Sequence, residues 1–463
     1  MSPDLRPCED GDGRPFDAGR AGDVPHGYAE RECLLTGTAA AYHEDPAEPG
    51  GIGVRARAPY VTRILVRTPE QPERFNGTVV VEWFNVSGFI DAGVEWLYTH
   101  SELVRGGYAW VGVSAQCAGV TGSALPPDGP APGGLKAADP ARYGTLRHPG
   151  DDYSYDIFSQ AGRAAAELFP GARLLAAGVS LSAYRLTTYI NHVDPLAQVY
   201  DGFLTHSRIG AASLLVLPDP PVMDPRPMPF RGDPRVPVLA LLTETDVVTL
   251  DYLAARQPDG PRLRVWEVAG AAHVDTYVDV AAGHDMSRVE PARLATALAP
   301  RRRAAGAELG HTVNAAPQHH YVANAAVHRL ARWVRDGTPP PHAPRLDVLP
   351  GPPPALRRDE LGNALGGVRT PWMDVPTAVL TGISPDDGLI ERLFGETVPF
   401  DAATLARLHP GGAADYLAAF GAATDAAVAE GFLLAADSAE IKALAAAAYP
   451  PAEIPAAASG TTP

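Results

Sequence analysis

Cysteine and lysine are both scarce in this chain of 463 residues. Only three cysteines occur, Cys8, Cys33 and Cys117, and no two of them have C-x-x-C spacing. An odd number of widely spaced cysteines argues against a disulfide framework and a structural zinc site, and it fits a reducing compartment. Lys136 and Lys442 are the only lysines, so nearly every cationic side chain is an arginine.

Long hydrophobic runs and surplus positive charge are also missing. The formal net charge of −16 at pH 7 disfavours nucleic acid and anionic membranes as partners, because both attract clustered Lys and Arg. No apolar run approaches the roughly 20 residues that cross a bilayer. Residues 1–20 hold no apolar segment of a secretory signal. We therefore expect a cytoplasmic protein with neither a nucleic acid nor a membrane partner.

Composition and periodicity divide the chain into three parts. Residues 1–27, rich in Gly, Asp and Pro, have the composition of a mobile N-terminal arm. Residues 28–345 form the predicted catalytic domain, which ends after an amphipathic helix that stops at Gly337. Residues 346–463 form a C-terminal extension that we expect to be mostly helical, with Asp437 and Glu440 as a capping box.

Strands alternate with helices through most of the predicted catalytic domain. Residues 28–42 and 60–70 alternate apolar and polar side chains, as half-buried strands do, whereas later runs are continuously apolar. This order predicts an α/β fold with a doubly wound, mostly parallel sheet after an antiparallel entry. The later strands are expected at 76–84, 109–115, 173–179, 199–207, 236–246 and 262–270, and helices at 154–168 and after Ser182.

The stretch "GVSLS" follows the apolar run 174–177 and precedes a helical pattern. In a nucleophile elbow, G-x-S-x-G, small residues two before and two after the serine let strand and helix approach closely. Gly178 and Ser182 meet this steric demand, so Ser180 is the predicted nucleophile. Ser114 in "GVSAQ" ends another strand, but Gln116 is bulky where a small residue is required. We interpret Ser114 as structural.

A serine nucleophile needs a base and a carboxylate that orients the base. Asp246 follows the strand 236–246 and His273 follows the strand 262–270, which gives the chain order Ser, acid, His of α/β-hydrolases. Glu244 is an alternative acid because it lies two residues nearer the strand. His319 and His320 are alternatives to His273, but they stand at a helix start.

Ester hydrolysis also needs backbone N–H groups that stabilise an oxyanion. One is expected from Leu181, directly after the nucleophile, and the second from Val86 or Ser87 in the loop "EWFNVSGF". Asn85 and Gly88 in this loop also suit a simple turn. The chain has no dinucleotide fingerprint, no P-loop, no H-E-x-x-H and no EF-hand pattern, so neither a cofactor nor a metal is expected.

Six longer stretches of the chain carry a resemblance to known proteins. They are NGTVVVEWFNVSGFIDAGVEW, GYAWVGVSAQCAGV, HPGDDYSYDIFSQAGRA, TETDV, QHHYVANAAVHRLARWVRDGTPPP and DELGNALGGVRTP. Together they resemble the bacterial "alpha/beta hydrolase domain-containing" proteins, a group of serine esterases. The likeness runs from about residue 28 to the C-terminus, and it implies an α/β-hydrolase fold with serine hydrolase chemistry.

The elbow departs from this family, whose usual sequence is G-E-S-Q-S. Val179 and Leu181 replace polar residues beside the nucleophile, which predicts a more apolar acyl site. Further residues are candidates for the rim of the substrate site, with buried hydrogen bonding as the alternative role. They are Asn85, Tyr155, His206 and Arg208.

These features predict a hydrolase of a small carboxylic ester or lactone that forms an acyl-serine intermediate. An acyltransferase or a cyclase would use the same residues, and a non-catalytic binding protein of this fold is a further alternative. The Pro-rich stretch 209–235 is expected to be either a lid over the substrate or a plain surface loop.

Overall fold

The computed structural model describes residues 4–8, 14–17, 24–45, 51–123, 133–218, 223–281, 289–304, 307–315, 317–388 and 390–450. Its centre is a nine-stranded sheet with the order β1-β2-β3-β5-β4-β6-β7-β8-β9. The strands are β1 (Asp4–Pro7), β2 (Tyr28–Asp45), β3 (Gly51–Pro69), β4 (Thr78–Trp83), β5 (Ala109–Val113), β6 (Arg173–Val179), β7 (Gly202–His206), β8 (Val238–Thr243) and β9 (Leu263–Val268).

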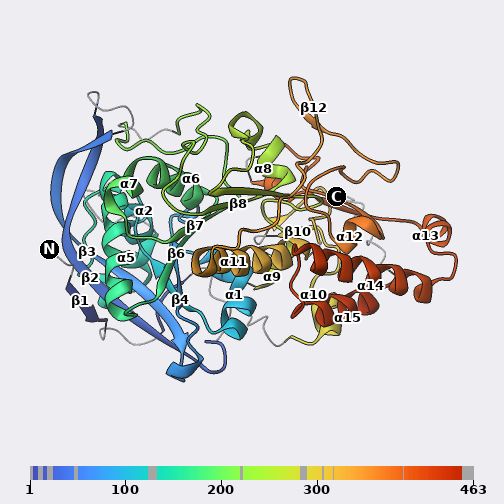
Figure 1. Ribbon diagram of the computed structural model, residues 1–463, viewed down its shortest axis with the longest axis horizontal. Coiled ribbons are helices and arrows are strands. Elements are labelled where there is room, and N and C mark those ends of the chain that lie inside the picture. The colour runs from blue at the N-terminus through green and yellow to red at the C-terminus, as the bar shows by residue number, and fades with distance from the viewer. Residues whose placement is uncertain are drawn as a thin grey trace, which may run out of the picture.

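The first three strands are antiparallel to their neighbours, and the strands from β5 to β9 run parallel. The predicted antiparallel entry and mostly parallel sheet are thus confirmed. Figure 1 shows the long β2–β3 hairpin at one end of the molecule and helices of the C-terminal region at the other. None of the helices in the described residues is long and apolar enough to cross a membrane.

Helices cover both faces of the parallel part of the sheet. Val79 and Val81 of β4 belong to the core under α5 (Ser154–Leu168) and α6 (Leu181–Thr188). Val80, between them, belongs to the opposite core under α1 (Val94–Gly106) and α11 (Gln318–Asp336). Successive side chains of a strand point to opposite faces, so a strand covered on both faces has a nearly continuous apolar run.

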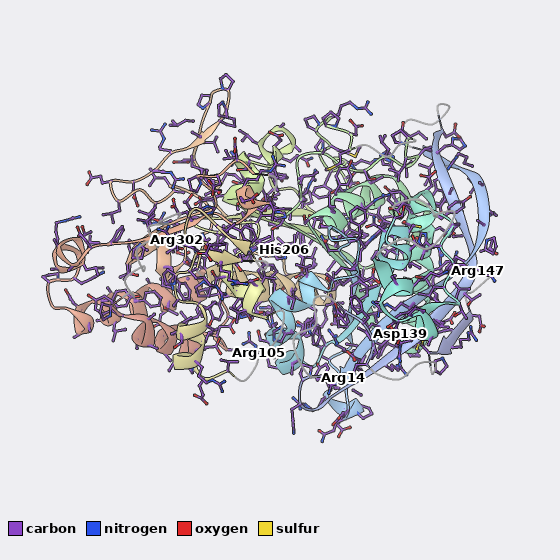
Figure 2. All side chains as sticks on the ribbon, turned by 180° about the vertical axis from the view of Figure 1, so that it is seen from behind. Arg14, Arg105, Asp139, Arg147, His206 and Arg302 are labelled. Atoms are coloured by element: carbon purple, nitrogen blue, oxygen red, sulfur yellow. The ribbon has the colours of Figure 1, made fainter. Side chains whose placement is uncertain are left out.

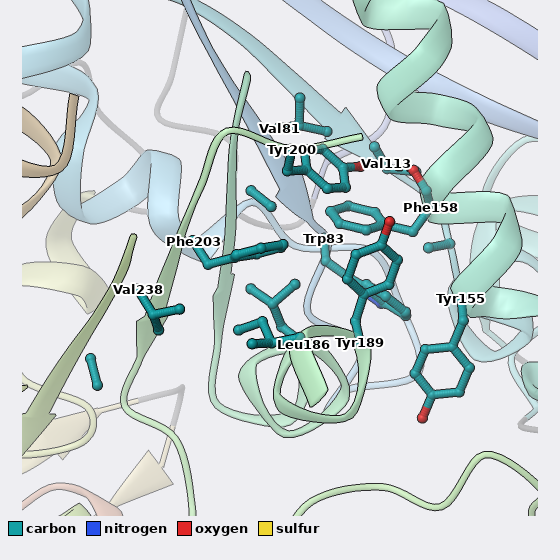
Figure 3. Packing of buried hydrophobic residues seen from close by; sticks show 14 of the residues in the cluster. Val81, Trp83, Val113, Tyr155, Phe158, Leu186, Tyr189, Tyr200, Phe203 and Val238 are labelled. Carbon is teal, nitrogen blue, oxygen red and sulfur yellow. Dashed lines mark hydrogen bonds between the residues drawn. The ribbon is translucent and has the colours of Figure 1, made fainter. Parts of the chain in front are cut away.

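Aromatic side chains fill the core on the α5 and α6 face. Phe158 of α5 lies 4.7 Å from Trp83 and 4.9 Å from Tyr200, measured between ring centroids. Tyr189, beyond the end of α6, meets Phe158 edge-on at 5.6 Å. Figure 3 shows these rings between the strands and helices, where they fix α5 and α6 against the sheet.

Helix α1 was not anticipated from the sequence. It ends at Gly107, which has a φ of 72° that favours glycine, and it carries Glu95 in its first turn and Arg105 in its last. An acid at the start, a base at the end and a glycine after them are helix signals. They mark "VEWLYTHSELVRG" as a helix between β4 and β5.

Shorter elements connect and extend this framework. The C-terminal region contains small two-stranded sheets and short helical turns up to Pro399 and is helical from Ala402. These further elements are α2 (Cys117–Thr121), α3 (Gly134–Ala138), α4 (Pro140–Tyr143), α7 (Asp194–Ala197), α8 (Glu244–Val248), α9 (Thr276–Ala281), α10 (Pro291–Ala297), β10 (Arg303–Ala304), β11 (Ala307–Glu308), β12 (Val348–Leu349), β13 (Ala355–Leu356), α12 (Pro371–Asp374), β14 (Ala378–Thr381), β15 (Glu396–Pro399), α13 (Ala402–Leu408), α14 (Ala413–Glu430) and α15 (Ser438–Ala448).

Two sequence predictions need correction. Part of the predicted arm is ordered, because Asp4–Pro7 pairs with β2 as strand β1; other parts of 1–27 lie outside the described residues. The capping box at Asp437 and Glu440 is absent, since the Asp437 side chain makes no cap hydrogen bond. Asp437 instead pairs with Arg105 of α1, and Glu440 accepts a hydrogen bond from Tyr321 of α11. These contacts attach α15 to the catalytic half of the chain.

Candidate active site

Ser180 lies at the turn between β6 and α6, with φ 58° and ψ −118°. This positive φ is strained for a residue with a side chain, and it is the geometry of a nucleophile elbow. A Cβ on Gly178 would lie 3.0 Å from the carbonyl carbon of Ser182, so a larger residue would fit only if the turn shifted by a few tenths of an ångström. The Ser182 hydroxyl accepts from the N–H of Val179 (2.9 Å) and donates to its carbonyl (2.8 Å). Serine therefore replaces the usual glycine and also braces the turn.

Three side chains predicted from separate segments meet at the end of the parallel sheet. His273 Nε2 lies 2.9 Å from Ser180 Oγ, and His273 Nδ1 lies 2.6 Å from Asp246 Oδ1. Asp246 is completely buried, His273 nearly so, and Ser180 is partly exposed. We call these three residues the Ser–His–Asp array.

The acid does not end its strand as expected, but lies in the first turn of the short helix α8. Asp246 Oδ2 accepts the backbone N–H of Thr243 (2.7 Å), and the Asp246 N–H donates to the Thr243 hydroxyl (3.3 Å). This reciprocal cap fixes the carboxylate, so that its second oxygen points to His273. The helix was too short to recognise in the sequence.

Glu244, the alternative acid, points away from His273. Its carboxylate accepts hydrogen bonds from the backbone N–H of Gly270 (2.6 Å), the hydroxyl of Thr381 (2.9 Å) and the N–H of Gly382 (2.9 Å). Burial raises the pKa of Glu244, and these donors oppose that rise. Glu244 thereby joins the loop before His273 to the C-terminal region.

The C-terminal region also supports the loop that carries His273. The Thr245 hydroxyl accepts the N–H of His273 (3.0 Å) and donates to the carbonyl of Gly382 (2.5 Å). The N–H of Val274 donates to the carbonyl of Leu393 (3.0 Å). These bonds come from residues more than 100 positions further along the chain, which sequence reasoning did not anticipate.

Asn85 links the predicted oxyanion loop to the elbow. Its Nδ2 donates to the carbonyl of Val179 (2.9 Å), and its Oδ1 accepts the N–H of Ser87 (2.8 Å). Because the Ser87 N–H is already used inside the loop, Val86 is the better of the two predicted donors. Asn85 itself is buried and connects two loops.

Replacing Asn85 with alanine should lower kcat by about 10²-fold with little change in KM, because loss of one aligned oxyanion donor costs about 10²- to 10³-fold. The measurement is steady-state hydrolysis of a p-nitrophenyl ester. Asn191→Ala is the matched control, since Asn191 also bridges two backbone segments, Pro229 and Arg231, away from the array. Equal losses of kcat in both variants would contradict a specific role for Asn85.

Ser114, the rival serine, is fully buried and bonded to charged groups. Its hydroxyl accepts from Arg63 Nε (3.0 Å) and donates to Asp91 Oδ2. Arg63 also pairs with Glu32 (2.7 Å) and with Asp91 (3.1 Å). This position agrees with the structural interpretation, because the cluster anchors Asp91 at the end of the oxyanion loop.

Cys117 is buried as well, and burial raises its pKa to about 12, which keeps it a thiol.

The remaining candidates for the substrate rim lie inside the protein. Tyr155 is buried and donates its hydroxyl to the carbonyl of Leu214 (3.0 Å). Arg208 is buried with its guanidinium 4.7 Å from the ring centre of Phe230, and it donates to backbone carbonyls. The Val179 side chain is also buried. These positions match the buried hydrogen-bonding role that the sequence left as the alternative for Tyr155 and Arg208.

The three other candidate histidines are buried too. His206 Nε2 lies 2.6 Å from His319 Nε2, and His206 Nδ1 lies 2.9 Å from Glu95. His320 contacts the carbonyl of Tyr98 and stacks on Tyr277 at 4.0 Å. Neither His319 nor His320 bonds to Ser180 in the hydrogen bonds of the described residues, whereas His273 does.

The described part of the Pro-rich stretch 209–235 packs on α6. Ser213 N–H donates to the carbonyl of Tyr184 (3.3 Å), and Asp224 N–H donates to the Tyr184 hydroxyl (3.2 Å). Residues 219–222 lie outside the described residues. Since α6 begins at the nucleophile, the segment borders the helix that carries Ser180.

A cavity of 360 Å³, lined mainly by apolar side chains of α10, β14 and α15, includes no member of the Ser–His–Asp array. Within the described ranges, no group of three or more His, Cys, Asp or Glu side chains is arranged to hold a metal ion.

The doubly wound sheet, the strained elbow and the adjacent histidine define an α/β-hydrolase. The sequence profile described as "alpha/beta hydrolase domain" matches residues 5–443, and the chain belongs to this family. None of the curated proteins matches the chain.

The solved structures that are similar to this chain are distant in sequence. Esterase Est22 is 12% identical with a TM-score of 0.31 and covers 54% of this chain and 76% of its own. An alpha-beta serine hydrolase homologue from Coxiella burnetii is 10% identical with a TM-score of 0.28, covering 50% and 87%. A fungal esterase from Rhizomucor miehei is 12% identical with a TM-score of 0.27, covering 52% and 77%.

Proposed function

We propose that the protein is a serine hydrolase that cleaves a carboxylic ester or lactone through an acyl-serine intermediate. The main support is the pair of hydrogen bonds that joins Ser180 to His273 and His273 to Asp246. A serine hydroxyl becomes a competent nucleophile when an oriented imidazole can take its proton.

In the first step Ser180 Oγ attacks the acyl carbon while its proton passes to His273 Nε2. Asp246 accepts the Nδ1–H of His273, which holds the tautomer that leaves Nε2 free and stabilises the imidazolium. His273 then protonates the leaving alkoxide, and the acyl group remains on Ser180. Water activated by His273 attacks this ester and regenerates the serine.

The oxyanion of each tetrahedral intermediate is assigned to the N–H groups of Leu181 and Val86. Leu181 is the first residue of α6, whose N-terminal amides and dipole favour negative charge. Val86 is held near the elbow by Asn85. Each such donor contributes about 3 kcal/mol to lowering the barrier.

An apolar acyl or alcohol group suits the exposed residues around these donors. Leu181 is partly exposed directly after the nucleophile. Phe89 is 54% exposed, and its N–H bonds to the carbonyl of Val86, so it belongs to the same tight turn as the proposed oxyanion donor. Apolar surface removed from water by a longer acyl chain contributes about 0.8 kcal/mol per CH₂.

Rapid-quench mass spectrometry with p-nitrophenyl acetate, butanoate and octanoate tests this proposal. We expect a burst of p-nitrophenol and an acyl mass on the peptide containing Ser180, with kcat/KM highest for a chain longer than acetyl. An acyl adduct on another residue would refute Ser180 as nucleophile. A preference for acetate would refute the apolar substrate, and a product acylated on an added alcohol would identify an acyltransferase.

A further inference from the structure

Four buried ionisable side chains form a line beneath the proposed active site. They are Glu95 of α1, His206 at the end of β7, His319 of α11 and Asp275 before α9, and each is completely buried. The contacts are 2.9 Å from Glu95 Oε2 to His206 Nδ1, 2.6 Å between the two Nε2 atoms, and 3.4 Å from His319 Nδ1 to Asp275 Oδ2. Figure 2 shows His206 in the middle of the molecule. We call this line the Glu95–Asp275 chain.

The Glu95–Asp275 chain contacts both segments that carry the proposed reacting groups, the elbow with Ser180 and the loop with His273. The carbonyl of His206 accepts the N–H of Ser180 (3.0 Å), and His206 lies opposite Val179 in the β6–β7 ladder. At the other end, Asp275 follows His273 by two residues, and its Oδ1 caps α9 by accepting the N–H of Val278 (3.0 Å). The Glu95–Asp275 chain therefore spans from the elbow to the His273 loop.

The number of protons on the four side chains limits how the Glu95–Asp275 chain can be hydrogen-bonded. A neutral imidazole offers one donor and one acceptor, so the contact of 2.6 Å between His206 and His319 requires a proton between two nitrogens. In one arrangement Glu95 is protonated and donates to His206, which donates to His319, and the Nδ1–H of His319 faces Asp275 Oδ2 at 3.4 Å without an aligned hydrogen bond. In the reverse arrangement Asp275 holds the proton and Glu95 holds the negative charge.

Burial favours a protonated Glu95, as in the first arrangement. It raises the pKa of Glu95 to about 8 and lowers the pKa of His206 to about 3. Other titratable groups face the chain: the Glu82 carboxylate accepts the N–H of Glu95 (2.8 Å), and the Tyr98 ring lies against both imidazoles. Asp246 and His273 also act electrostatically on His206.

We propose that the Glu95–Asp275 chain, through its two hydrogen bonds and the contact of His319 with Asp275, positions the His273 loop against the nucleophile elbow. This inference rests on the proposed function. When Glu95 gives its proton to water at alkaline pH, His206 must donate Nδ1–H to the new carboxylate. His319 must then donate Nε2–H to His206, which leaves Nδ1 facing Asp275 without a proton. The contact of His319 with Asp275 is then lost, at the end of the chain next to His273.

Three variants of the full chain separate this role from simple packing. Glu95→Gln keeps a donor towards His206 and cannot ionise. His319→Phe removes both ring nitrogens at similar size. His320→Phe is the matched control, because His320 is the next residue of α11 and equally buried, but lies outside the Glu95–Asp275 chain.

Proton NMR with ¹⁵N-labelled histidine is the first measurement. We expect a far-downfield, exchange-protected N–H resonance for the proton between His206 and His319 in the wild type, Glu95→Gln and His320→Phe. It should be missing in His319→Phe. Absence of the resonance from the wild type would contradict the proposed Glu95–Asp275 chain, whether or not the protein is a hydrolase.

The pH dependence of p-nitrophenyl ester hydrolysis is the second measurement. We expect wild-type kcat to fall as the pH rises through about 8, and Glu95→Gln to lack this fall. His319→Phe should lose between about 10- and 100-fold in kcat with KM little changed, as a slightly misplaced reacting group does. His320→Phe should keep the wild-type kcat.

Several outcomes would overturn the inference. A folded His319→Phe with wild-type kcat would do so, as would a Glu95→Gln profile that still falls with the wild type. If His319→Phe does not fold, the pH profile of Glu95→Gln alone tests the inference. A wild type without any esterase activity refutes the proposed function instead, and the NMR resonance reports the Glu95–Asp275 chain separately in the same sample.

Discussion

Replacing Ser180 with alanine is expected to lower kcat for ester hydrolysis by about 10⁶-fold, the size of loss seen when a serine hydrolase loses its nucleophile. The alanine cannot form the acyl intermediate, and His273 has no hydroxyl to deprotonate. Residual activity above the uncatalysed rate should remain, because Leu181 and Val86 still stabilise an oxyanion formed by direct attack of water. Initial rates with p-nitrophenyl butanoate measure this loss.

A fluorophosphonate probe provides the second measurement of the same variant. The wild type should be labelled on Ser180, and Ser180→Ala should not be labelled. Ser114→Ala is the control, because Ser114 is buried and bonded to Arg63 and Asp91, and this variant should still be labelled. Labelling of Ser180→Ala to the wild-type extent would place the nucleophile elsewhere.

Replacing Asp246 with asparagine is expected to lower kcat by about 10⁴-fold. The amide can donate to His273 Nδ1 and so favours the wrong tautomer, in which Nε2 carries a proton and cannot accept one from Ser180. In the described structure the buried His273 Nδ1 bonds to Asp246, so the introduced amide would take the place of its hydrogen-bond partner. The full pH profile of kcat/KM should show the loss across the neutral range.

Glu244→Gln is the matched comparison for this prediction. Glu244 follows the same strand and is equally buried, yet its bonds go to Gly270, Thr381 and Gly382. We expect a loss of about 1–3 kcal/mol in the free energy of unfolding, since a buried acceptor is weakened, with kcat reduced less than about tenfold. Urea unfolding and initial rates together measure the two effects. A larger loss of kcat in Glu244→Gln than in Asp246→Asn would indicate that Glu244, and not Asp246, is the carboxylate that orients His273.

The large features of the fold were predictable because they follow from burial of whole strands. A strand covered on both faces has a nearly continuous apolar run, and β4, β6 and β8 have such runs in the sequence. The position of Ser180 was predictable for a similar reason: a tight turn between strand and helix excludes large side chains, and Gly178 and Ser182 are small. Chain order then pointed to Asp246 and His273.

Other features could not be predicted because they depend on contacts between distant segments. Asn85 uses the N–H of Ser87 inside the loop, which favours Val86 as the donor, and nothing in "NVSG" distinguishes these neighbours. His206 and His319 are 113 residues apart and appear unrelated in the sequence. The first turn of α11 brings them together, and only then does their shared proton become evident.

The sequence by itself determined an α/β-hydrolase fold, the elbow serine and the order of its partners, because local sterics and burial patterns are written in neighbouring residues. The tertiary structure decided which of two acids faces His273 and which loop amides are free. It also decided that Gly382 and Leu393 support the His273 loop, through the bonds of Thr245 to Gly382 and of Val274 to Leu393. The physical reason is that hydrogen-bond direction depends on side-chain orientation, which only the packed chain fixes.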